Sequence, residues 1–550
     1  MTFDTILSRG TLVDGTGTPG RTEDIGIQND QITAIGDLSG ASAAEVVDCT
    51  GRIVSPGFID IHTHYDPQIL WDPELTPSSW FGVTTAIVGN CGFTIAPMRP
   101  SRRETCIEIL GNVEAMSVDA LHEGISWEFE SFGEYLGAIE KRGPALNIGA
   151  FVGHTALRLY GMDDPQREAS DDEVRAMRAQ LDAAMADGAW GFSTSKSPAH
   201  VGSSGQPVPS RMATTDEILK LGDVLGSARA GVIQGVSGPG LSIEDLGKLA
   251  RDTGRPVTWC SLHQGVDGGK HWEYSERTDR QRAEGADLWA QMGCLPIVSQ
   301  FTLDYPYVLN SVPAFGAISG LPRAERIARL GDPAWQHEAR RQVEENIAGL
   351  TYQIRWDRMS VAESTAHPEL QGMTIAEIAG AGSPLQAMFE IARDDDFATR
   401  FKLIMFNYDQ DEVARLLDRD STILGLGDGG AHANQLCDSS FPLHLLGSFV
   451  RERGDFPIEK AVWRLTGHPA KVFGIARRGT IKPGHFADIC VFDAATVGET
   501  PSTRVFDFPA GADRLIKRPR GIDHVMVNGA FIRRDGQNIE GTRAGRLLRP

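Results

Sequence analysis

Two histidines separated by one residue, His62 and His64, have the spacing that most directly suggests chemistry in this chain. On an extended strand, side chains two positions apart lie on the same face, so both imidazoles project together while Thr63 points away. Imidazole nitrogen is a common ligand of zinc, and two imidazoles on one face can clamp a metal ion. An isolated pair of this kind can equally well pack or form hydrogen bonds. The surroundings of the pair must therefore decide.

The residues around this pair extend the pattern well beyond three positions. The apolar stretch Ile53–Ile61 precedes the histidines, with a turn at Pro56 and Gly57 and with Asp60 just ahead of the pair. An apolar run bounded by such a turn is typical of a buried strand. The longer match favours a metal site over simple packing.

Apolar strand-like runs alternate with helical stretches between residues 55 and 478, for example around Asp171–Ala186 and Asp216–Ala228. This alternation is typical of a parallel sheet covered by helices. Eight strands are expected, ending near His64, Cys91, His154, Ser195, Val236, His263, Ser299 and Asp428. Eight such units predict an α/β fold, a (β/α)8 TIM-like barrel, whose site lies at the carboxyl ends of the strands.

A long stretch within this region does not fit a barrel connection. It runs from about residue 300 to about 420 and is too long for one crossover between strands. Its charged helical segments, Ala324–Ala348 and Asp411–Leu417, indicate an insertion into the barrel domain of residues 55–478.

The two ends of the chain share a different texture, in which short β-like runs are separated by turn residues. Such runs occur between Phe3 and Val54 and return near the other end, for example in Ala487–Phe492. Segments with matching texture can join in one domain. We therefore predict that residues 1–54 and 479–550 form a small composite β-sandwich domain.

Composition and charge exclude several classes of partner. A net charge of −20 argues against nucleic acid, because binding phosphates requires Lys and Arg. No window reaches the roughly 18 apolar residues of a membrane span, and the N-terminus lacks the features of a signal peptide. The seven cysteines are scattered and contain no CxxC pair, which favours a reducing compartment. We expect a cytoplasmic protein with neither nucleic acid nor membrane as partner.

The stretch Pro56–His64 resembles the PGFIDxHxH motif on the first strand of the amidohydrolase superfamily, and Pro483–Asp493 resembles its closing PGxxADxxxxD segment. The resemblance implies that Asp428, in the glycine-rich run Ile423–Gly430, ligates metal and accepts a proton from the attacking water. A simple turn aspartate is the alternative for Asp428. Because the closing segment is structural in that superfamily, Asp488 is not a catalytic candidate.

Within the superfamily, the chain most resembles the D-aminoacylase-like N-acyl-D-amino acid deacylases. Gly89–Gly92 resembles their cysteine motif, which implies that the Cys91 thiolate ligates zinc, whereas a small buried thiol is the alternative. Val152–Arg158 resembles their third-strand motif, which implies that His154 orients the substrate or stabilises an oxyanion, unless it is a core histidine. Arg158 is a candidate anchor for a substrate carboxylate, because a planar guanidinium suits that contact.

Two strands depart from the pattern of these deacylases, which carry one histidine on the fifth strand and another on the sixth. The fifth strand here, Gly231–Ser237, has no histidine, and its Gln234 is a poor zinc ligand. On the sixth strand, His263 falls about two residues later than expected, a shift that keeps it on the same strand face. His263 is therefore a further candidate metal ligand.

The remaining set of His62, His64, Cys91 and Asp428 suffices for one catalytic zinc ion, which needs three protein ligands and an open position. We expect one tightly bound Zn²⁺, while a second ion stays open. Lys196 ends the fourth strand where hydantoinase-like relatives carry a carboxylated, metal-bridging lysine, so it is another candidate ligand. A surface lysine or an anchor for a substrate carboxylate is the alternative.

Together these residues predict a metal-dependent hydrolase of a C–N bond in a small-molecule substrate, similar to the N-acyl-D-amino acid deacylases, with Asp428 as general base. A hydantoinase-like or lactonase-like hydrolase of cyclic amides or esters is the nearest alternative. A barrel that has lost its metal and acts as a binding protein is a second class. Members of the superfamily often associate, so a homo-oligomer also stays open.

Overall fold

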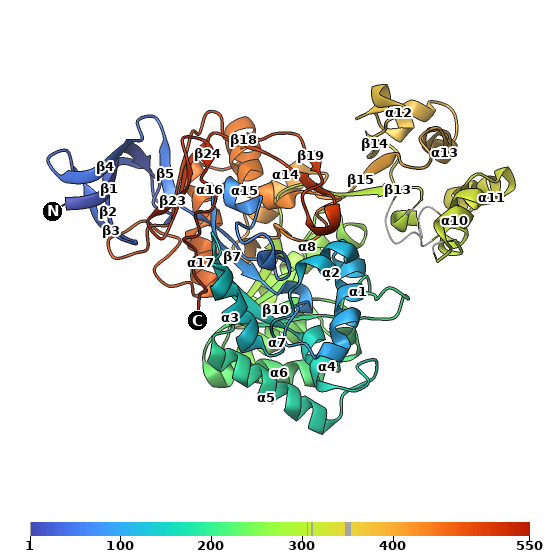
Figure 1. Ribbon diagram of the computed structural model, residues 1–550, viewed down its shortest axis with the longest axis horizontal. Helices are drawn as coiled ribbons and strands as arrows, with labels where there is room; N and C mark the ends of the chain where they lie inside the picture. The colour runs from blue at the N-terminus through green and yellow to red at the C-terminus, as the bar shows by residue number, and fades with distance from the viewer. Residues whose placement is uncertain (1, 305, 310–311, 319, 347–353) are drawn as a thin grey trace. The chain divides into compact units, whose positions relative to one another are not determined.

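The computed structural model describes residues 2–304, 306–309, 312–318, 320–346 and 354–550 (Figure 1). The chain divides into two compact units. The larger unit contains the residues up to His263 together with Gly269–Leu295 and Asp411–Pro550. The smaller unit contains Gln264–Gly268 and Pro296–Gln410.

Eight parallel strands form the centre of the larger unit. They are β6 (Phe58–Asp60), β7 (Val83–Val88), β8 (Asn147–Gly153), β9 (Gly191–Ser195), β10 (Val232–Val236), β11 (Val257–Cys260), β12 (Leu288–Met292) and β16 (Thr422–Leu424). Their order in the sheet follows their order in the chain. The edge strands meet beyond their regular ends, where Thr63 bridges Gly429 and the His64 N–H donates to the Gly429 carbonyl at 2.7 Å. These contacts close the predicted (β/α)8 barrel.

The seventh barrel strand is β12, whereas the alternation of the sequence predicts a strand ending near Ser299. Ser299 instead lies in β13 (Ile297–Thr302), which pairs antiparallel with β15 (Arg400–Phe406) in the smaller unit. Both runs are short and apolar, so local pattern does not distinguish them. The neighbouring strands identify the seventh barrel strand as β12, because β12 pairs with β11 on one side and with β16 on the other.

Helices connect the barrel strands and lie on the outside of the barrel (Figure 1). The main ones are α1 (Arg103–Val113), α2 (Val118–Gly124), α3 (Phe132–Arg142), α4 (His154–Gly161), α5 (Asp171–Asp187), α6 (Thr215–Ala228), α7 (Ile243–Thr253), α8 (His271–Ala283), α16 (Ile458–Leu465) and α17 (Gly467–Phe473). Two of them, α5 and α6, match the helices that the sequence predicts. In α5, a capping box between Ser170 and Glu173 starts the helix and Gly188, with φ +108°, ends it.

The two terminal segments join in one nine-stranded mixed sheet. Its strands are β1 (Thr2–Leu12), β2 (Arg21–Gln28), β3 (Gln31–Gly36), β4 (Ser42–Asp48), β5 (Ile53–Pro56), β17 (Ile489–Phe492), β22 (Ile522–Val527), β23 (Ala530–Arg534) and β24 (Gln537–Asn538). The segments meet where β5 pairs antiparallel with β17, so the strand that leads into the first barrel strand is clamped by the C-terminal segment. Leu12, Ile25 and Ile489 are among the apolar side chains buried in its core.

The smaller unit has its own antiparallel sheet, in the order β13, β15 and β14 (Met359–Glu363), and its own apolar cluster around Phe315 and Phe389. The single helix expected at Ala324–Ala348 is two helices, α10 (Arg323–Leu330) and α11 (Pro333–Asn346). Gly331 and Pro333 explain the break, since both residue types disfavour a helix interior. Residues 347 and 348 lie outside the described part of the chain.

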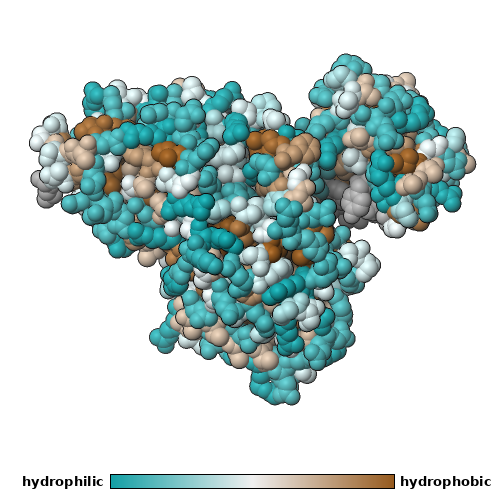
Figure 2. Space-filling view, viewed as in Figure 1, coloured by the Kyte–Doolittle hydropathy of each residue, from teal (hydrophilic) through white to brown (hydrophobic). Residues whose placement is uncertain are grey.

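The helix predicted at Asp411–Leu417 is α14 (Gln410–Leu417), and from Asp411 onward it belongs to the barrel unit rather than to the smaller one. Among the described residues, no helix is both long enough and apolar enough to cross a membrane. The face of the molecule drawn in Figure 2 is mostly hydrophilic, with apolar residues scattered over it, in keeping with the net charge of −20.

Candidate metal centre

The backbone at the end of β6 holds the histidine pair in place. The Asp60 carboxylate accepts a hydrogen bond from the His62 N–H at 3.1 Å. A Cβ at Gly427 would lie 2.0 Å from Asp60 Oδ2, so the loop that carries Asp428 can pass here only as glycine. Burial, opposed by the hydrogen bond from His62, raises the pKa of Asp60 to about 8. Asp60 therefore fixes the backbone of His62 and the path of the loop that carries Asp428.

Imidazole, thiol and carboxylate groups converge above this layer. His62 Nε2 lies 3.3 Å from Cys91 Sγ and 3.4 Å from Asp428 Oδ1, and His64 Nε2 lies 3.9 Å from the same oxygen. The ligand atoms of the two histidines and Cys91 all lie within 4.8 Å of one another. Two nitrogen or oxygen ligands of a tetrahedral zinc ion lie about 3.3 Å apart, so this donor set fits the ion that the sequence predicts.

The surrounding side chains prepare the imidazoles for a metal. His62 Nδ1 lies 2.6 Å from Gln291 Oε1, an acceptor that places the proton on Nδ1 and leaves the lone pair of Nε2 facing the cluster. Gln291 in turn donates to Thr258 Oγ1 at 3.0 Å, which orients its amide. Burial lowers the pKa of both His62 and His64, and metals bind the neutral imidazole.

Cys91 projects from the turn after β7, where its backbone has φ +57°. Asp66 supports this turn, because its Oδ2 accepts a hydrogen bond from Gly89 N at 3.0 Å. The neighbouring Cys260 thiol and burial raise the pKa of Cys91 well above its usual range. A coordinating metal removes the proton of such a thiol outright.

One side of the cluster is accessible to solvent, because its residues differ in how far they are exposed. His62, His64 and Cys91 are buried, whereas the Asp428 side chain is 29% exposed. The φ of +42° at Asp428 turns its side chain at the end of the last strand, the position predicted for it. The carboxylate can thus face both an ion and a solvent-derived water molecule.

Two candidate ligands lie apart from this cluster. The Lys196 ammonium is buried and donates to the carbonyls of Arg211 and Ala213 at 2.5 and 2.6 Å, so Lys196 is neither a surface lysine nor a member of the cluster. His263 does not belong to the group of His62, His64 and Cys91 that could hold an ion, although the charges of Asp428 and His62 influence its pKa. Burial lowers the pKa of His263 to about 4.

The two predicted substrate-binding residues contact a third residue instead. His154 Nε2 lies 2.9 Å from Glu217 Oε1, and its Nδ1 lies 2.8 Å from Thr194 Oγ1. The Arg158 guanidinium, also buried, donates to both oxygens of Glu217 at 2.6 Å. These polar atoms therefore have partners within the fold, and a role of His154 and Arg158 in substrate binding stays a prediction.

Two residues close to the cluster, Glu114 and His432, are not predicted by the sequence motifs. Glu114 Oε2 lies 3.6 Å from His64 Nε2 and 3.7 Å from His432 Nε2. Burial and the charge of Asp428 raise the pKa of Glu114 well above its usual range. Glu114 follows α1 with no local motif, whereas His432, four residues after Asp428, could have been considered from its position alone.

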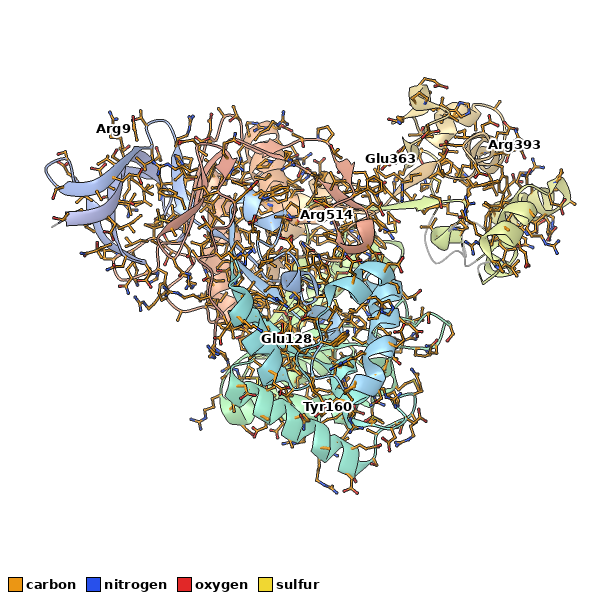
Figure 3. The ribbon with its side chains drawn as sticks, viewed as in Figure 1. Arg9, Glu128, Tyr160, Glu363, Arg393 and Arg514 are labelled. Carbon is orange, nitrogen blue, oxygen red and sulfur yellow. The ribbon has the colours of Figure 1, made fainter. Side chains whose placement is uncertain are left out.

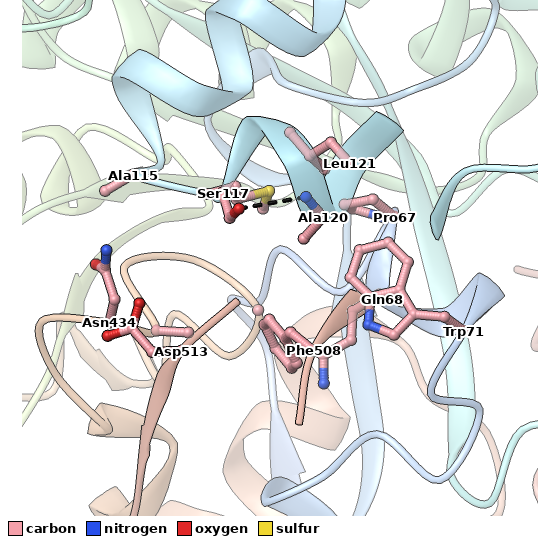
Figure 4. A pocket seen from close by; sticks show the side chains of 13 residues that line it. Pro67, Gln68, Trp71, Ala115, Ser117, Ala120, Leu121, Asn434, Phe508 and Asp513 are labelled. Carbon is pink, nitrogen blue, oxygen red and sulfur yellow. Dashed lines mark hydrogen bonds between the residues drawn. The ribbon is translucent and has the colours of Figure 1, made fainter. Parts of the chain in front are cut away.

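A pocket lies near the cluster, since its lining includes Ala115, which follows Glu114 in the chain, and Gly430, two residues after Asp428. Figure 4 shows Ala120 and Leu121 on one side of it, facing Trp71 and Phe508 on the other. The two aromatic rings meet edge to face, with 6.0 Å between their centroids. Its lining consists of Pro67, Gln68, Trp71, Ala115, Met116, Ser117, Ala120, Leu121, Gly430, Ala433, Asn434, Phe508 and Asp513, without a basic residue.

An adjoining pocket connects this space to the general-base candidate. It shares Gln68 and Gly430 with the first pocket and is lined by Asp428. Arg514, labelled in Figure 3, also lines it. Its guanidinium donates to the two carboxylate oxygens of Asp507 at 2.8 and 2.9 Å, which neutralises most of its attraction for an anion.

The barrel is closed, and imidazole, thiol and carboxylate groups converge at the ends of its strands. This arrangement is typical of metal-dependent hydrolases. The chain belongs to the amidohydrolase family: the sequence model described as "Amidohydrolase family" matches residues 45–533. The family predicted from the motifs, and with it the barrel fold and the hydrolase class, are thereby confirmed.

Individual relatives match the whole chain. The D-aminoacylase of Alcaligenes xylosoxydans xylosoxydans is 33% identical over 561 residues, which cover 99% of this chain and 97% of that enzyme. A crystal structure of D-aminoacylase superposes with a TM-score of 0.69 at 30% identity and covers both chains completely. The N-acyl-D-glutamate deacylase of Bordetella bronchiseptica, in complex with zinc and a phosphonate inhibitor, has a TM-score of 0.69 at 28% identity, again with complete coverage of both.

Proposed function

We propose that this chain is a zinc-dependent deacylase of N-acyl-D-amino acids, and that it hydrolyses their amide bond. The observation that carries the proposal is the convergence of His62 Nε2 with Cys91 Sγ and Asp428 Oδ1, at 3.3 and 3.4 Å, beside an open pocket. The full-length similarity to D-aminoacylase supports the choice of substrate class. One tightly held ion suits the ligands His62, His64, Cys91 and Asp428.

The residues of the chain divide the work of hydrolysis. When bound, the zinc ion supplies Lewis acidity, which polarises a carbonyl and acidifies water enough for attack at neutral pH. His62 and His64 hold the ion, and Gln291 keeps the His62 ring oriented. Asp428 accepts the proton of the attacking water and delivers it to the leaving nitrogen. Its partial exposure lets it reach both.

The pocket lining indicates what the substrate carries. Trp71, Leu121 and Phe508 offer apolar surface, and the lining contains Asp513 but no Lys or Arg. A carboxylate side chain on the substrate would meet no positive partner in this lining, whose Asp513 is itself paired with Arg504. We therefore propose that the group held in this pocket, an acyl chain or an amino acid side chain, is apolar rather than acidic.

Metal analysis and a substrate panel test the proposal together. We expect about one equivalent of zinc per chain, loss of activity on chelation and its return with added zinc. N-acyl-D-amino acids with apolar side chains should be hydrolysed faster than their L-enantiomers, hydantoins and lactones. Preferential turnover of a hydantoin or lactone would refute the substrate assignment. A purified chain with far less than one equivalent of any metal would favour a binding protein.

Location and assembly are part of the same proposal. All seven cysteines are buried and none is part of a disulfide, which supports a reducing compartment such as the cytoplasm. Association of copies into a homo-oligomer stays a prediction, which light scattering of the purified protein can test.

A further inference from the structure

The carboxyl group of Glu114 lies between two imidazoles at the edge of the predicted metal site. Its Oε2 is 3.6 Å from His64 Nε2 and 3.7 Å from His432 Nε2. Glu114 is buried, with only 4% of its surface exposed. In the described part of the chain, these two histidines are the only ion-pair partners of its carboxyl group. The side chain of Glu114 is therefore directed at residues of the site and not at a basic residue of the fold.

The local structure around Glu114 does not favour a carboxylate. Glu114 directly follows α1, and its N–H caps this helix by donating to the Leu110 carbonyl at 3.0 Å. The C-terminal end of a helix carries partial negative charge, so a carboxylate is unfavourable there. Burial adds to this cost, because a carboxyl group taken out of water needs a polar partner. Partners outside the helix must therefore explain a glutamate at this position, and the two imidazoles are the groups within reach.

The backbone of Glu114 connects to the loop that carries Asp428. The Glu114 carbonyl accepts a hydrogen bond from His432 N at 2.6 Å. The same loop is held to itself where Ala431 N donates to the Asp428 carbonyl at 2.9 Å. Glu114 thus contacts the end of the first barrel strand through His64 and the loop after the last strand through His432. These are the two segments that meet where the barrel closes.

We propose that Glu114 is a positioning residue of the metal centre, and that its carboxyl group fixes the ring of the predicted zinc ligand His64 beside that of His432. The inference rests on the metal centre of the proposed function. A carboxylate next to a metal-binding histidine orients the ring and strengthens its hold on the ion. Among the described residues, the group that could hold an ion is His62, His64 and Cys91, so Glu114 acts through His64.

Zinc titrations of the full-length protein and two variants test the proposal. Glu114→Leu should raise the zinc dissociation constant by about 10 to 100-fold. Glu114→Gln keeps an oxygen at the same place and should recover most of the affinity. Equal dissociation constants of wild type and Glu114→Leu would overturn the proposal. A Glu114→Gln variant as weak as Glu114→Leu would also overturn it, because the charge of the carboxylate, and not its contact with the rings, would then be responsible.

Urea unfolding of the zinc-free proteins separates positioning from a general loosening of the fold. The midpoint of Glu114→Leu should equal or exceed that of the wild type, because an apolar side chain can replace a buried ionic group without loss of stability. Glu217→Gln is the matched control. Glu217 is equally buried but accepts hydrogen bonds from Arg158 at both oxygens, so this variant should unfold at lower urea and keep its zinc affinity. A midpoint of Glu114→Leu as low as that of Glu217→Gln would attribute weak zinc binding to a loosened fold and overturn the proposal.

The zinc titrations also separate this inference from the proposed function. Weaker zinc binding by Glu114→Leu, with no hydrolysis of N-acyl-D-amino acids by the wild type, would leave the inference standing and refute the proposed function. Hydrolysis by the wild type, with equal zinc affinity in wild type and Glu114→Leu, would do the opposite. A wild-type chain that binds no zinc would overturn both.

Discussion

Gln291 Oε1 lies 2.6 Å from His62 Nδ1 across the barrel, although 229 residues separate the two in the chain. The contact directs the other ring nitrogen of His62 at Cys91 and Asp428, the predicted metal ligands. Outer hydrogen bonds of this kind are worth about 10 to 100-fold in metal affinity. We therefore expect residues without any metal ligand atom, such as Gln291, to influence how tightly this site holds an ion.

Replacing Gln291 tests this relationship. Gln291→Leu should raise the zinc dissociation constant by about 10 to 100-fold, because the His62 ring loses the acceptor that sets its tautomer. Gln291→Glu keeps an acceptor at that place and should recover most of the affinity. Competition with a chromophoric chelator measures both values. Equal affinities of wild type and Gln291→Leu would contradict the role.

Asp428→Asn separates catalysis from metal binding. The amide keeps the size of the side chain but cannot accept the proton of water, so kcat should fall by about 10² to 10⁴-fold. Zinc content should stay near one equivalent, because His62, His64 and Cys91 remain. Asp535→Asn on the exposed terminal sheet is a matched control that should change neither quantity. Near-normal turnover of Asp428→Asn would remove Asp428 from the role of base.

Trp71 should contribute to binding of an apolar substrate group. Trp71→Ala removes apolar surface from the pocket and should raise KM for N-acyl-D-amino acids with apolar side chains by roughly tenfold, with kcat little changed. Trp127→Ala, which lies outside this lining, serves as the control in the same steady-state measurements. A Trp71 variant with unaltered KM would place the substrate elsewhere.

Glu217 joins His154 and Arg158 into a buried network. Glu217→Ala leaves the Arg158 guanidinium buried without a counter-charge and should lower the free energy of unfolding by about 3 to 5 kcal/mol. Glu244→Ala, which removes a partly exposed ion pair with Arg277, should cost at most about 1 kcal/mol. Urea denaturation measures both. Similar losses in the two variants would contradict the buried network.

His468 makes the fold sensitive to acid. Burial, and after it the charge of Arg464, lowers the pKa of His468 to about 3, whereas an unfolded histidine titrates near pH 6.5. The unfolded chain therefore binds more protons between these values. The contribution is complete above about pH 6.5 and is lost as the pH falls toward 3, by up to about 1.4 kcal/mol per pH unit.

His468→Phe tests this dependence. The ring stacks on Trp463 with 4.5 Å between centroids, so phenylalanine preserves the contact and removes the titration. Unfolding free energies measured between pH 4 and pH 7 should depend less steeply on pH in the variant. Parallel pH curves for variant and wild type would show that His468 is not responsible.

The local sequence pattern was sufficient to predict features that depend only on residues close together in the chain. The two-residue spacing brings the rings of His62 and His64 together just beyond the end of β6, with 5.4 Å between their centroids. The capping residues around α5 define its ends without help from the rest of the chain. The same reasoning failed at Ser299, because a short apolar run becomes a barrel strand only through its neighbours. It could not reveal the partner of Arg158, because Glu217 lies 59 residues further along the chain.

The sequence by itself determined the family and the barrel, and it predicts the four metal-site residues His62, His64, Cys91 and Asp428, because spacing and strand ends are local properties that motifs record. Only the tertiary structure decided what surrounds them. Closure of the barrel brings Gln291 to His62, and the neighbouring strands bring Cys260 and Gln234 to Cys91. Whether a polar side chain faces an ion or is satisfied within the fold depends on partners distant in sequence, and no spacing rule contains them.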